Sequence, residues 1–416
     1  MPAKLARRTP ETVVFTAATG VALLHALDDA FLGRQPGVGF MQHALGALVA
    51  LLGAVGAVSL FPRVRPSARA AFALLFGSLA LVNGALHIKH LGAESMAASD
   101  LTGVLAAVAG GALVLLAAYI PFRHRGAGAT STRRRWAYRV LAVPATLVGL
   151  LMIVMMGVAL TETHKFRTPI GAAPSGDYRE VAFKADDGVK LSGWYRPTRN
   201  GATVIVLHGG GGDRTGAVAH ARMLARHGYG VLLYDARGRG RSEGTQNSFG
   251  WGWGHDVTGA VAFLKTRPEV DPRRIGGLGL STGADVLVEA AGQHDDLRAV
   301  VGDGTAAGSF EDWRRLQGIT GFTPFLAAEF ATVRLTSGAK SGPPLEEMVR
   351  HGHAPLLLVS GGRDVEYDFN VHYDAVAGDR DVEHWNLPQA GHTGGLHAAP
   401  RQYEQRVTAF FAANLG

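Results

Sequence analysis

One serine lies in a sequence context that can support nucleophilic chemistry. Ser281 is framed by Gly279 and Gly283 in the stretch GLSTG, and an apolar run ends just before it at Leu280. Glycines at these positions let neighbouring backbone approach where a Cβ atom would clash, so the chain can turn sharply from a strand into a helix. The helix that follows would point its positive N-terminal end at the hydroxyl. The pattern predicts a nucleophile elbow.

A glycine-rich phosphate-binding turn is the alternative interpretation of this stretch. The glycines at positions 277, 279 and 283 miss the spacing of the dinucleotide-binding fingerprint by one residue. No Gly-Lys-Ser or Gly-Lys-Thr follows, as a nucleotide P-loop would require. The nucleophile hypothesis is favoured if the chain also supplies a base, an acid and an oxyanion hole.

Three other segments supply those groups. A strand expected at 203–207 runs into the loop HGGGGD, which can place the Gly210 N–H beside the serine, and the Thr282 N–H would complete an oxyanion hole. The segment LLLVSGGRD ends in a loop that carries Asp364, and LPQAGHTGG places His392 after the last expected strand. The chain order serine, acid, histidine is the order that this architecture requires.

Together these motifs resemble the α/β-hydrolases, and most closely the bacterial BEM46-like and dipeptidyl-aminopeptidase-like serine hydrolases. The resemblance covers residues 178–416 and does not extend to residues 1–160. The matching stretches are HGGGG after the strand at 203–207, DARGRGRSEG at 235–244, RIGGLGLSTGA at 274–284, GGRD at 361–364 and AGHTGG at 390–395.

The resemblance also bears on which carboxylate orients the histidine. Members of the family end this strand in GxxD, which implies Asp364 as the acid of a Ser–His–Asp triad. Glu366 lies two residues later in the same loop and is the alternative acid. His397 is the second choice for the base after His392.

The order of short apolar runs predicts an α/β fold. A hairpin is expected around the Asp187-Gly188 turn, and strands then alternate with helices, which is typical of a mostly parallel sheet flanked by helices. The segment 305–353 lies between two sheet strands, and we expect it to form a cap over the site. We therefore divide the chain into a transmembrane helical domain at 1–160, a linker at 161–177 and an α/β-hydrolase domain at 178–416.

The first 160 residues have the composition of membrane-spanning segments, for which about 20 apolar residues suffice. Blocks without charge alternate with short polar loops, and buried helices of a soluble protein are the less favoured alternative. We expect an all-α bundle of about five transmembrane helices, at 13–32, 40–61, 70–88, 101–122 and 140–160.

Charge predicts the direction of these spans. The region holds 14 Lys and Arg against 5 Asp and Glu, whereas residues 161–416 hold 27 against 29. The excess of basic residues therefore belongs to the helical region, and the sequence gives no sign of nucleic-acid binding. The basic residues gather at the N-terminus and in the second and fourth loops. Positively charged loops stay in the cytoplasm. The pattern predicts a multi-pass protein of the cell membrane with a cytoplasmic N-terminus and an extracytoplasmic hydrolase domain.

Six ionisable residues of the helical region are expected near the outer surface. Their spacing would place them on shared helix faces at one depth. Three interpretations are open: a metal or proton-relay site, a contact surface for the hydrolase domain, or simple hydration at the interface. Hydration is the default. The residues are His25, Asp28, Asp29, His43, His87 and His90.

The whole sequence predicts a membrane-anchored serine hydrolase that cleaves carboxylic esters, or less readily amides or peptides, through an acyl-enzyme. The chain has no cysteine, so a thiol nucleophile and disulfides are excluded. We expect an acyl substrate and contact with a lipid bilayer, and no metal or organic cofactor for the reaction. The alternative is a membrane transporter, metal or sensor protein with an accessory or inactive hydrolase domain.

Overall fold

The computed structural model describes residues 9–31, 40–88, 98–124, 131–163, 170–362 and 365–416. The chain divides into two compact units, Met1–Val158 and Ala159–Gly416. We describe each unit by itself. The division falls close to the expected boundary at residue 160, but the last turn of the fifth helix belongs to the second unit.

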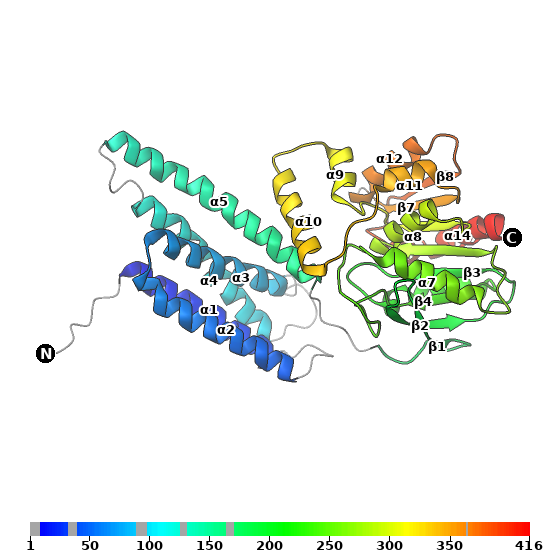
Figure 1. The fold of residues 1–416 in the computed structure, drawn as a ribbon, viewed down its shortest axis with the longest axis horizontal. Coiled ribbons are helices and arrows are strands. Elements are labelled where there is room, and N and C mark those ends of the chain that lie inside the picture. The colour runs from blue at the N-terminus through cyan, green and yellow to red at the C-terminus, as the bar shows by residue number, and fades with distance from the viewer. Residues whose placement is uncertain (1–8, 32–39, 89–97, 125–130, 164–169, 363–364) are drawn as a thin grey trace. The chain divides into compact units, whose positions relative to one another are not determined.

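The first unit is all-helical (Figure 1). Small residues let two of its helices approach closely, because a Cβ atom at Gly84 would lie 2.5 Å from the Gly103 carbonyl oxygen. Stacked rings of Phe15 and Phe61, 4.0 Å apart, lie in its apolar core. The helices are α1 (Pro10–Phe31), α2 (Phe40–Leu60), the 3-10 turn η1 (Phe61–Arg63), α3 (Pro66–Ile88), α4 (Ala98–His124) and α5 (Thr132–Thr163).

A helix lies at each of the five expected spans, but the five-span prediction is met only in part. Within the described residues, two helical segments are long and apolar enough to cross a membrane: Pro10–Asp28, with mean hydropathy 1.3, and Leu101–His124, with mean hydropathy 2.3. A buried helix of a soluble protein can pass the same test. Membrane insertion of this unit therefore stays a prediction.

The second unit is built on an eight-stranded sheet with the order β1-β2-β4-β3-β5-β6-β7-β8. β1 pairs antiparallel with β2, β2 pairs antiparallel with β4, and the remaining pairs are parallel. The expected hairpin is present, with Gly188 at φ +92° in its turn. The strands are β1 (Arg179–Lys184), β2 (Lys190–Arg196), β3 (Thr203–Leu207), β4 (Gly230–Tyr234), β5 (Ile275–Leu280), β6 (Val300–Asp303), β7 (Leu356–Gly361) and β8 (Val382–Leu387).

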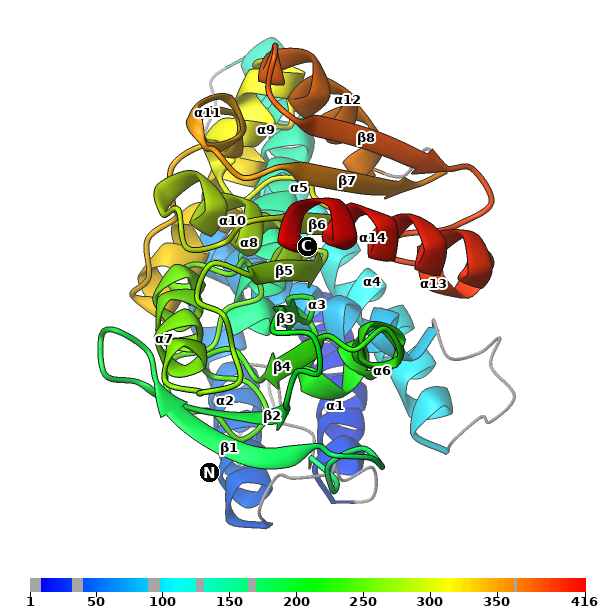
Figure 2. The ribbon, with the colours of Figure 1, turned by 90° about the vertical axis from the view of Figure 1, so that its right-hand side faces the viewer.

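Helices cover both faces of this sheet (Figure 2). The central strands β3, β4 and β5 are buried along their whole length, which explains their continuous apolar sequences. One face packs against η3 (Arg214–Ala217), α6 (Val218–Arg226), α13 (Gly395–Ala398) and α14 (Pro400–Leu415). The other packs against α7 (Trp253–Lys265), α8 (Thr282–Gln293), α11 (Leu345–His351) and α12 (Val365–Ala377).

The segment expected to form a cap lies between β6 and β7 and contains three helices. They are α9 (Phe310–Gln317), α10 (Thr323–Ser337) and α11. Leu345 and Val349 of α11 belong to the core of the sheet, so α11 is part of the helical layer. We therefore use the term cap helices for α9 and α10 alone.

Candidate active site

Ser281 lies on a sharp turn between β5 and α8. Its backbone has φ +52° and ψ −125°, a conformation that costs a non-glycine residue free energy and that clusters at functional sites. A Cβ atom at Gly279 would lie 2.3 Å from the Gly283 carbonyl oxygen, and one at Gly283 would lie 2.5 Å from the His208 carbonyl oxygen. Both flanking glycines are therefore required by close backbone packing, as the sequence pattern predicts.

His392 reaches the serine from the loop after β8. Its Nε2 atom is 2.8 Å from the Ser281 Oγ atom. A Cβ atom at Gly304, whose φ is +82°, would lie 2.8 Å from the imidazole Cε1 atom, so a glycine is needed behind the ring. The next residue, Thr393, also has a positive φ of +54°. The tight loop thus aims the imidazole at the hydroxyl.

Glu366 is the carboxylate that the structure places beside this histidine. Its Oε2 atom lies 3.0 Å from His392 Nδ1, and its side chain is fully buried in the first turn of α12. The Gly361 N–H donates to the other carboxylate oxygen, at 3.4 Å. Asp364, the acid implied by the family resemblance, lies outside the described residues. The acid position that the structure describes is therefore that of the alternative, Glu366.

The charges of the pair support each other. The interaction with Glu366 raises the pKa of His392 above its usual value, although partial burial of the ring opposes this. Burial alone would raise the pKa of Glu366, but its contacts with His392 and the Gly361 N–H outweigh burial and hold that pKa below the usual range. The glutamate is therefore ionised at neutral pH and stabilises the imidazolium.

Two further carboxyl groups, which the sequence reasoning missed, act on His392 through their charge. Asp303 ends β6 and accepts a hydrogen bond of 2.7 Å from the Tyr403 hydroxyl, and burial raises its pKa to about 6. Asp285 accepts the Ala306 N–H at 2.7 Å, and burial raises its pKa to about 7. Asp285 lies in the first turn of α8, four residues after the serine, a spacing that could have indicated it.

The two residues expected to form the oxyanion hole lie close together. A Cβ atom at Gly210 would come within 2.7 Å of the Thr282 Oγ1 atom. Among the described residues, neither backbone N–H donates to another backbone carbonyl. Thr282 is the first residue of α8, where helix N–H groups are left without intrahelical acceptors. Both N–H groups are therefore candidates for binding an oxyanion.

A buried ion pair holds the loops around the site in place. Its carboxylate, Asp235, is a structural group and takes no part in the chemistry. Asp235 is fully buried and accepts hydrogen bonds from the Arg214 backbone N–H at 2.9 Å and from its guanidinium at 2.8 Å. It also accepts the Arg241 N–H at 2.8 Å. Asp235 thus ties the loops after β3 and β4 together.

The strand order and the elbow after β5 decide the architecture. The C-terminal unit has the α/β-hydrolase fold. Residues 187–359 match the sequence model of the X-Pro dipeptidyl-peptidase (S15) family. This match contains Ser281 and ends before Glu366 and His392.

Curated relatives share part of the chain. The uncharacterized protein Rv2307c of Mycobacterium tuberculosis is 30% identical over 194 residues, which are 46% of this chain and 63% of that protein. The uncharacterized protein YfhR of Escherichia coli K12 is 32% identical over 135 residues, 30% of this chain and 47% of YfhR. Thiohydrolase aneE of Aspergillus aculeatus is 33% identical over 128 residues, 30% of this chain and 40% of aneE. The chain spans less than two thirds of each relative's length.

Among solved structures, the Pyrococcus furiosus esterase Pf2001 is similar to this chain. The alignment covers 60% of this chain and 99% of the esterase, at 24% sequence identity and a TM-score of 0.49.

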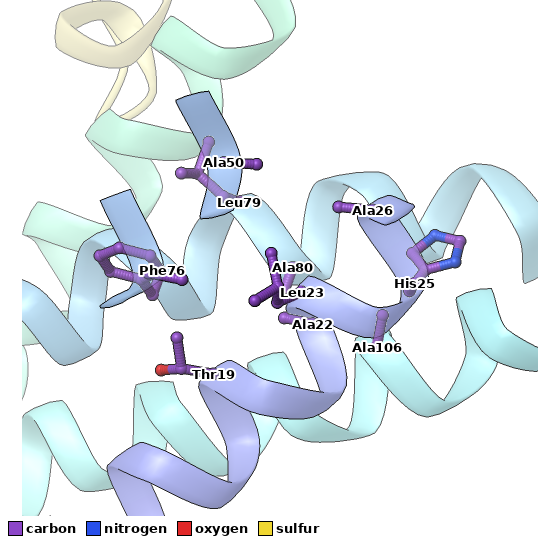
Figure 3. A pocket seen from close by; sticks show the side chains of 11 residues that line it. Thr19, Ala22, Leu23, His25, Ala26, Ala50, Phe76, Leu79, Ala80 and Ala106 are labelled. Atoms are coloured by element: carbon purple, nitrogen blue, oxygen red, sulfur yellow. The ribbon is translucent and has the colours of Figure 1, made fainter. Parts of the chain in front are cut away.

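The polar residues of the helical unit are described only in part. His25 Nδ1 is 3.0 Å from the Thr102 Oγ1 atom, and the Thr102 hydroxyl donates to Asp28 at 2.5 Å. Among the described residues, His25 and Thr19 are the two polar side chains that line an otherwise apolar cavity of about 170 Å³ (Figure 3).

The structure describes only two side chains of the six-residue cluster that the sequence suggested, so the metal-site interpretation stays untested. His90 and the side chains of Asp29, His43 and His87 lie outside the described residues. Within the part of the chain that the structure describes, no three His, Cys, Asp or Glu side chains group as metal ligands.

Proposed function

We propose that this chain is a serine hydrolase that cleaves carboxylic esters with Ser281 as nucleophile, His392 as base and Glu366 as the acid that orients the base. The observation that carries the proposal is the 2.8 Å contact between Ser281 Oγ and His392 Nε2, made by a serine in a strained backbone conformation. A serine hydroxyl is a weak nucleophile by itself and needs such an adjacent base.

Acylation follows from the positions of these groups. The Ser281 Oγ attacks the substrate carbonyl carbon while His392 Nε2 takes the hydroxyl proton. The negative charge that develops on the carbonyl oxygen is stabilised by the N–H groups of Gly210 and Thr282. The ionised Glu366 stabilises the imidazolium. The imidazolium then gives its proton to the leaving alkoxide, the bond to the leaving group breaks, and the acyl-serine ester remains.

Deacylation uses the same groups in the same order. His392 takes a proton from water as the water oxygen attacks the acyl carbon. The oxyanion again lies between the two N–H groups, and the proton returns to Ser281 Oγ as the serine ester bond breaks. The carboxylic acid product is released and the site is restored.

The match to the X-Pro dipeptidyl-peptidase family favours a second candidate reaction. In that reaction the acyl group would be a dipeptide that ends in proline and the leaving group would be an amine. The same three residues would carry it, because amide and ester hydrolysis differ mainly in the leaving group. Hydrolysis of Xaa-Pro p-nitroanilides faster than p-nitrophenyl butyrate, compared by kcat/KM, would favour the peptidase.

We further propose that the helical region anchors the enzyme in a membrane, with the catalytic unit extracytoplasmic. Two observations support this proposal. Two helical segments are long and apolar enough to cross a membrane, and the basic loops lie at the ends expected to be cytoplasmic. A protease added to intact spheroplasts should digest the catalytic unit. Protection until the cells are lysed would contradict the proposed orientation.

A fluorophosphonate probe tests the nucleophile directly. The purified full-length chain should be labelled and should hydrolyse p-nitrophenyl butyrate. Ser281→Ala should lose labelling, and its turnover should fall by about 10³-fold or more, with any residual rate due to the oxyanion hole and substrate binding. Ser341→Ala, at an exposed serine of the same unit, should behave as wild type. Equal labelling of wild type and Ser281→Ala would refute the assignment.

A further inference from the structure

The segment Asn247–Trp251, between β4 and α7, lies against both expected oxyanion donors. We propose that Ser248 is a positioning residue that sets the relative placement of Gly210 and Thr282, and that the last turn of α5 holds Ser248 in place. This inference rests on the proposed function. It implies that residues 159–163, which end the helical region, complete the catalytic unit.

The Ser248 carbonyl oxygen contacts both donor residues. It accepts a hydrogen bond of 2.9 Å from the Thr282 hydroxyl. On the other side it packs so closely on Gly210 that a Cβ atom there would lie only 2.0 Å away. One carbonyl therefore sets the spacing between the loop after β3 and the first turn of α8. Any movement of Ser248 would change the distance between the two N–H groups.

The segment has a fixed shape of its own. The Asn247 side chain is buried, and its amide accepts the Trp251 N–H and donates to the Trp251 carbonyl, both at 2.9 Å. The Trp251 indole N–H donates to the Gly308 carbonyl at 2.9 Å, next to the cap helices. Gly250 has φ +73°, and a Cβ atom there would lie 2.7 Å from the Thr282 Cγ2 atom. The turn is therefore wedged against the nucleophile helix.

Ser248 is held from behind by two groups. Its N–H and its hydroxyl both donate to the Glu162 carbonyl, at 3.1 Å and 3.2 Å. The Arg239 guanidinium donates to the same hydroxyl at 2.5 Å. A serine is suited to this position because its oxygen can donate to one partner and accept from the other. Glu162 lies in the last turn of α5, within the same compact unit as the active site.

The cap helix α10 contacts the last turn of α5. The Thr336 hydroxyl lies 3.1 Å from the Thr163 hydroxyl and 2.8 Å from the Thr332 carbonyl of its own helix, and Thr163 donates to the Ala159 carbonyl at 3.2 Å. Ala159 is buried in a small apolar cluster with Trp251 and Phe330. The contacts form a continuous path from α10 through α5 to Ser248 and the oxyanion hole.

The expected consequence is specific to the transition state. The oxyanion donors act on charge that develops during the reaction, so a misplaced donor lowers kcat and leaves substrate binding nearly unchanged. A boronic acid, which forms a tetrahedral adduct with the serine, should lose affinity in parallel with kcat.

The test compares threonine-to-valine variants of the full-length chain, because valine keeps the shape and removes the hydroxyl. Thr282→Val removes the bond to Ser248 and should lower kcat for p-nitrophenyl butyrate about 10-fold, with KM within 2-fold and phenylboronic acid affinity reduced in step. Thr336→Val should lower kcat about 3-fold. The matched controls are Thr258→Val on α7 and Thr332→Val on α10, whose hydroxyls, among the described residues, bond only to carbonyls of their own helices.

A double-mutant cycle decides whether the path acts through Ser248. If it does, Thr336→Val should add little when Thr282→Val is already present. This inference would be overturned if the two substitutions had multiplicative effects on kcat, or if their kcat values equalled those of the controls. The proposed function would still stand in that case, provided that the wild type turns over substrate and is labelled by the probe. A wild type that neither turns over nor reacts with the probe would overturn both. A melting temperature equal to that of the matched control excludes general unfolding as the cause.

Discussion

The two units of this chain use polar residues in different ways. In the catalytic unit, Ser281, His392 and Glu366 come from three separate segments, and His392 lies 2.8 Å from the serine Oγ atom and 3.0 Å from the glutamate Oε2 atom. In the helical unit, one group of polar contacts joins α1 and α4 through His25, Thr102 and Asp28, and another joins Glu11 to Arg69 and His124. Parallel strands end at one sheet edge, so residues that follow them converge by topology. Helices offer no such common edge, so their polar contacts depend on packing.

The largest expected effect concerns the carboxylate. Glu366→Gln removes the charge that stabilises the imidazolium, and kcat/KM should fall by about 10³-fold. Asp364→Asn is the matched change two residues away and should stay within about 5-fold of wild type. Both are measured with p-nitrophenyl butyrate. A large loss in Asp364→Asn with an active Glu366→Gln would restore the acid that the family resemblance implies.

Asp285 should affect stability in a pH-dependent way. Its folded-state pKa of about 7 lies above the ordinary value of 3.8, so the wild type loses stability from this group as pH rises from about 4 to about 7. Asp285→Asn keeps an acceptor for Ala306 and removes that loss. The variant should gain on the order of 2 kcal/mol in unfolding free energy at pH 8 and little at pH 4. Equal gains at both pH values would contradict the buried charge.

His25 should matter for the helical unit alone. His25→Ala removes a buried ring and its hydrogen bond to Thr102, which should cost on the order of 1–3 kcal/mol of stability. Ester turnover at 25 °C should remain within 2-fold of wild type, because this link is structural. Thermal unfolding and steady-state kinetics measure the two effects. A variant with wild-type stability and lost turnover would give His25 a functional role that we do not assign.

The pH dependence of turnover should show the smallest effect. His392 must be neutral to accept the serine proton, and its pKa is raised by Glu366. The acid limb of kcat/KM should therefore have its midpoint above 6.5, with activity lost below it. In Glu366→Gln the midpoint of the residual activity should move to lower pH. An unchanged midpoint would show that another group controls the limb.

Sequence alone was enough for the parts of the fold that depend on local pattern. The apolar run at 203–207 predicted a strand where the structure has β3. The glycines around Ser281 predicted the turn because the constraint they relieve is local backbone packing. The tight glycine loop after the last strand likewise singled out His392.

Contacts between distant segments could not be predicted from the sequence. Asp364 and Glu366 both follow β7, and only the start of α12 determines that Glu366 faces His392. The role that we propose for Ser248 has no sequence motif, because its contact with Thr282 is made by a backbone carbonyl, a group that every residue possesses. The sequence determined which side chains are available for chemistry, because their type and local spacing carry that information. The tertiary structure decided which of them meet, because that depends on how the loops pack over the end of the sheet.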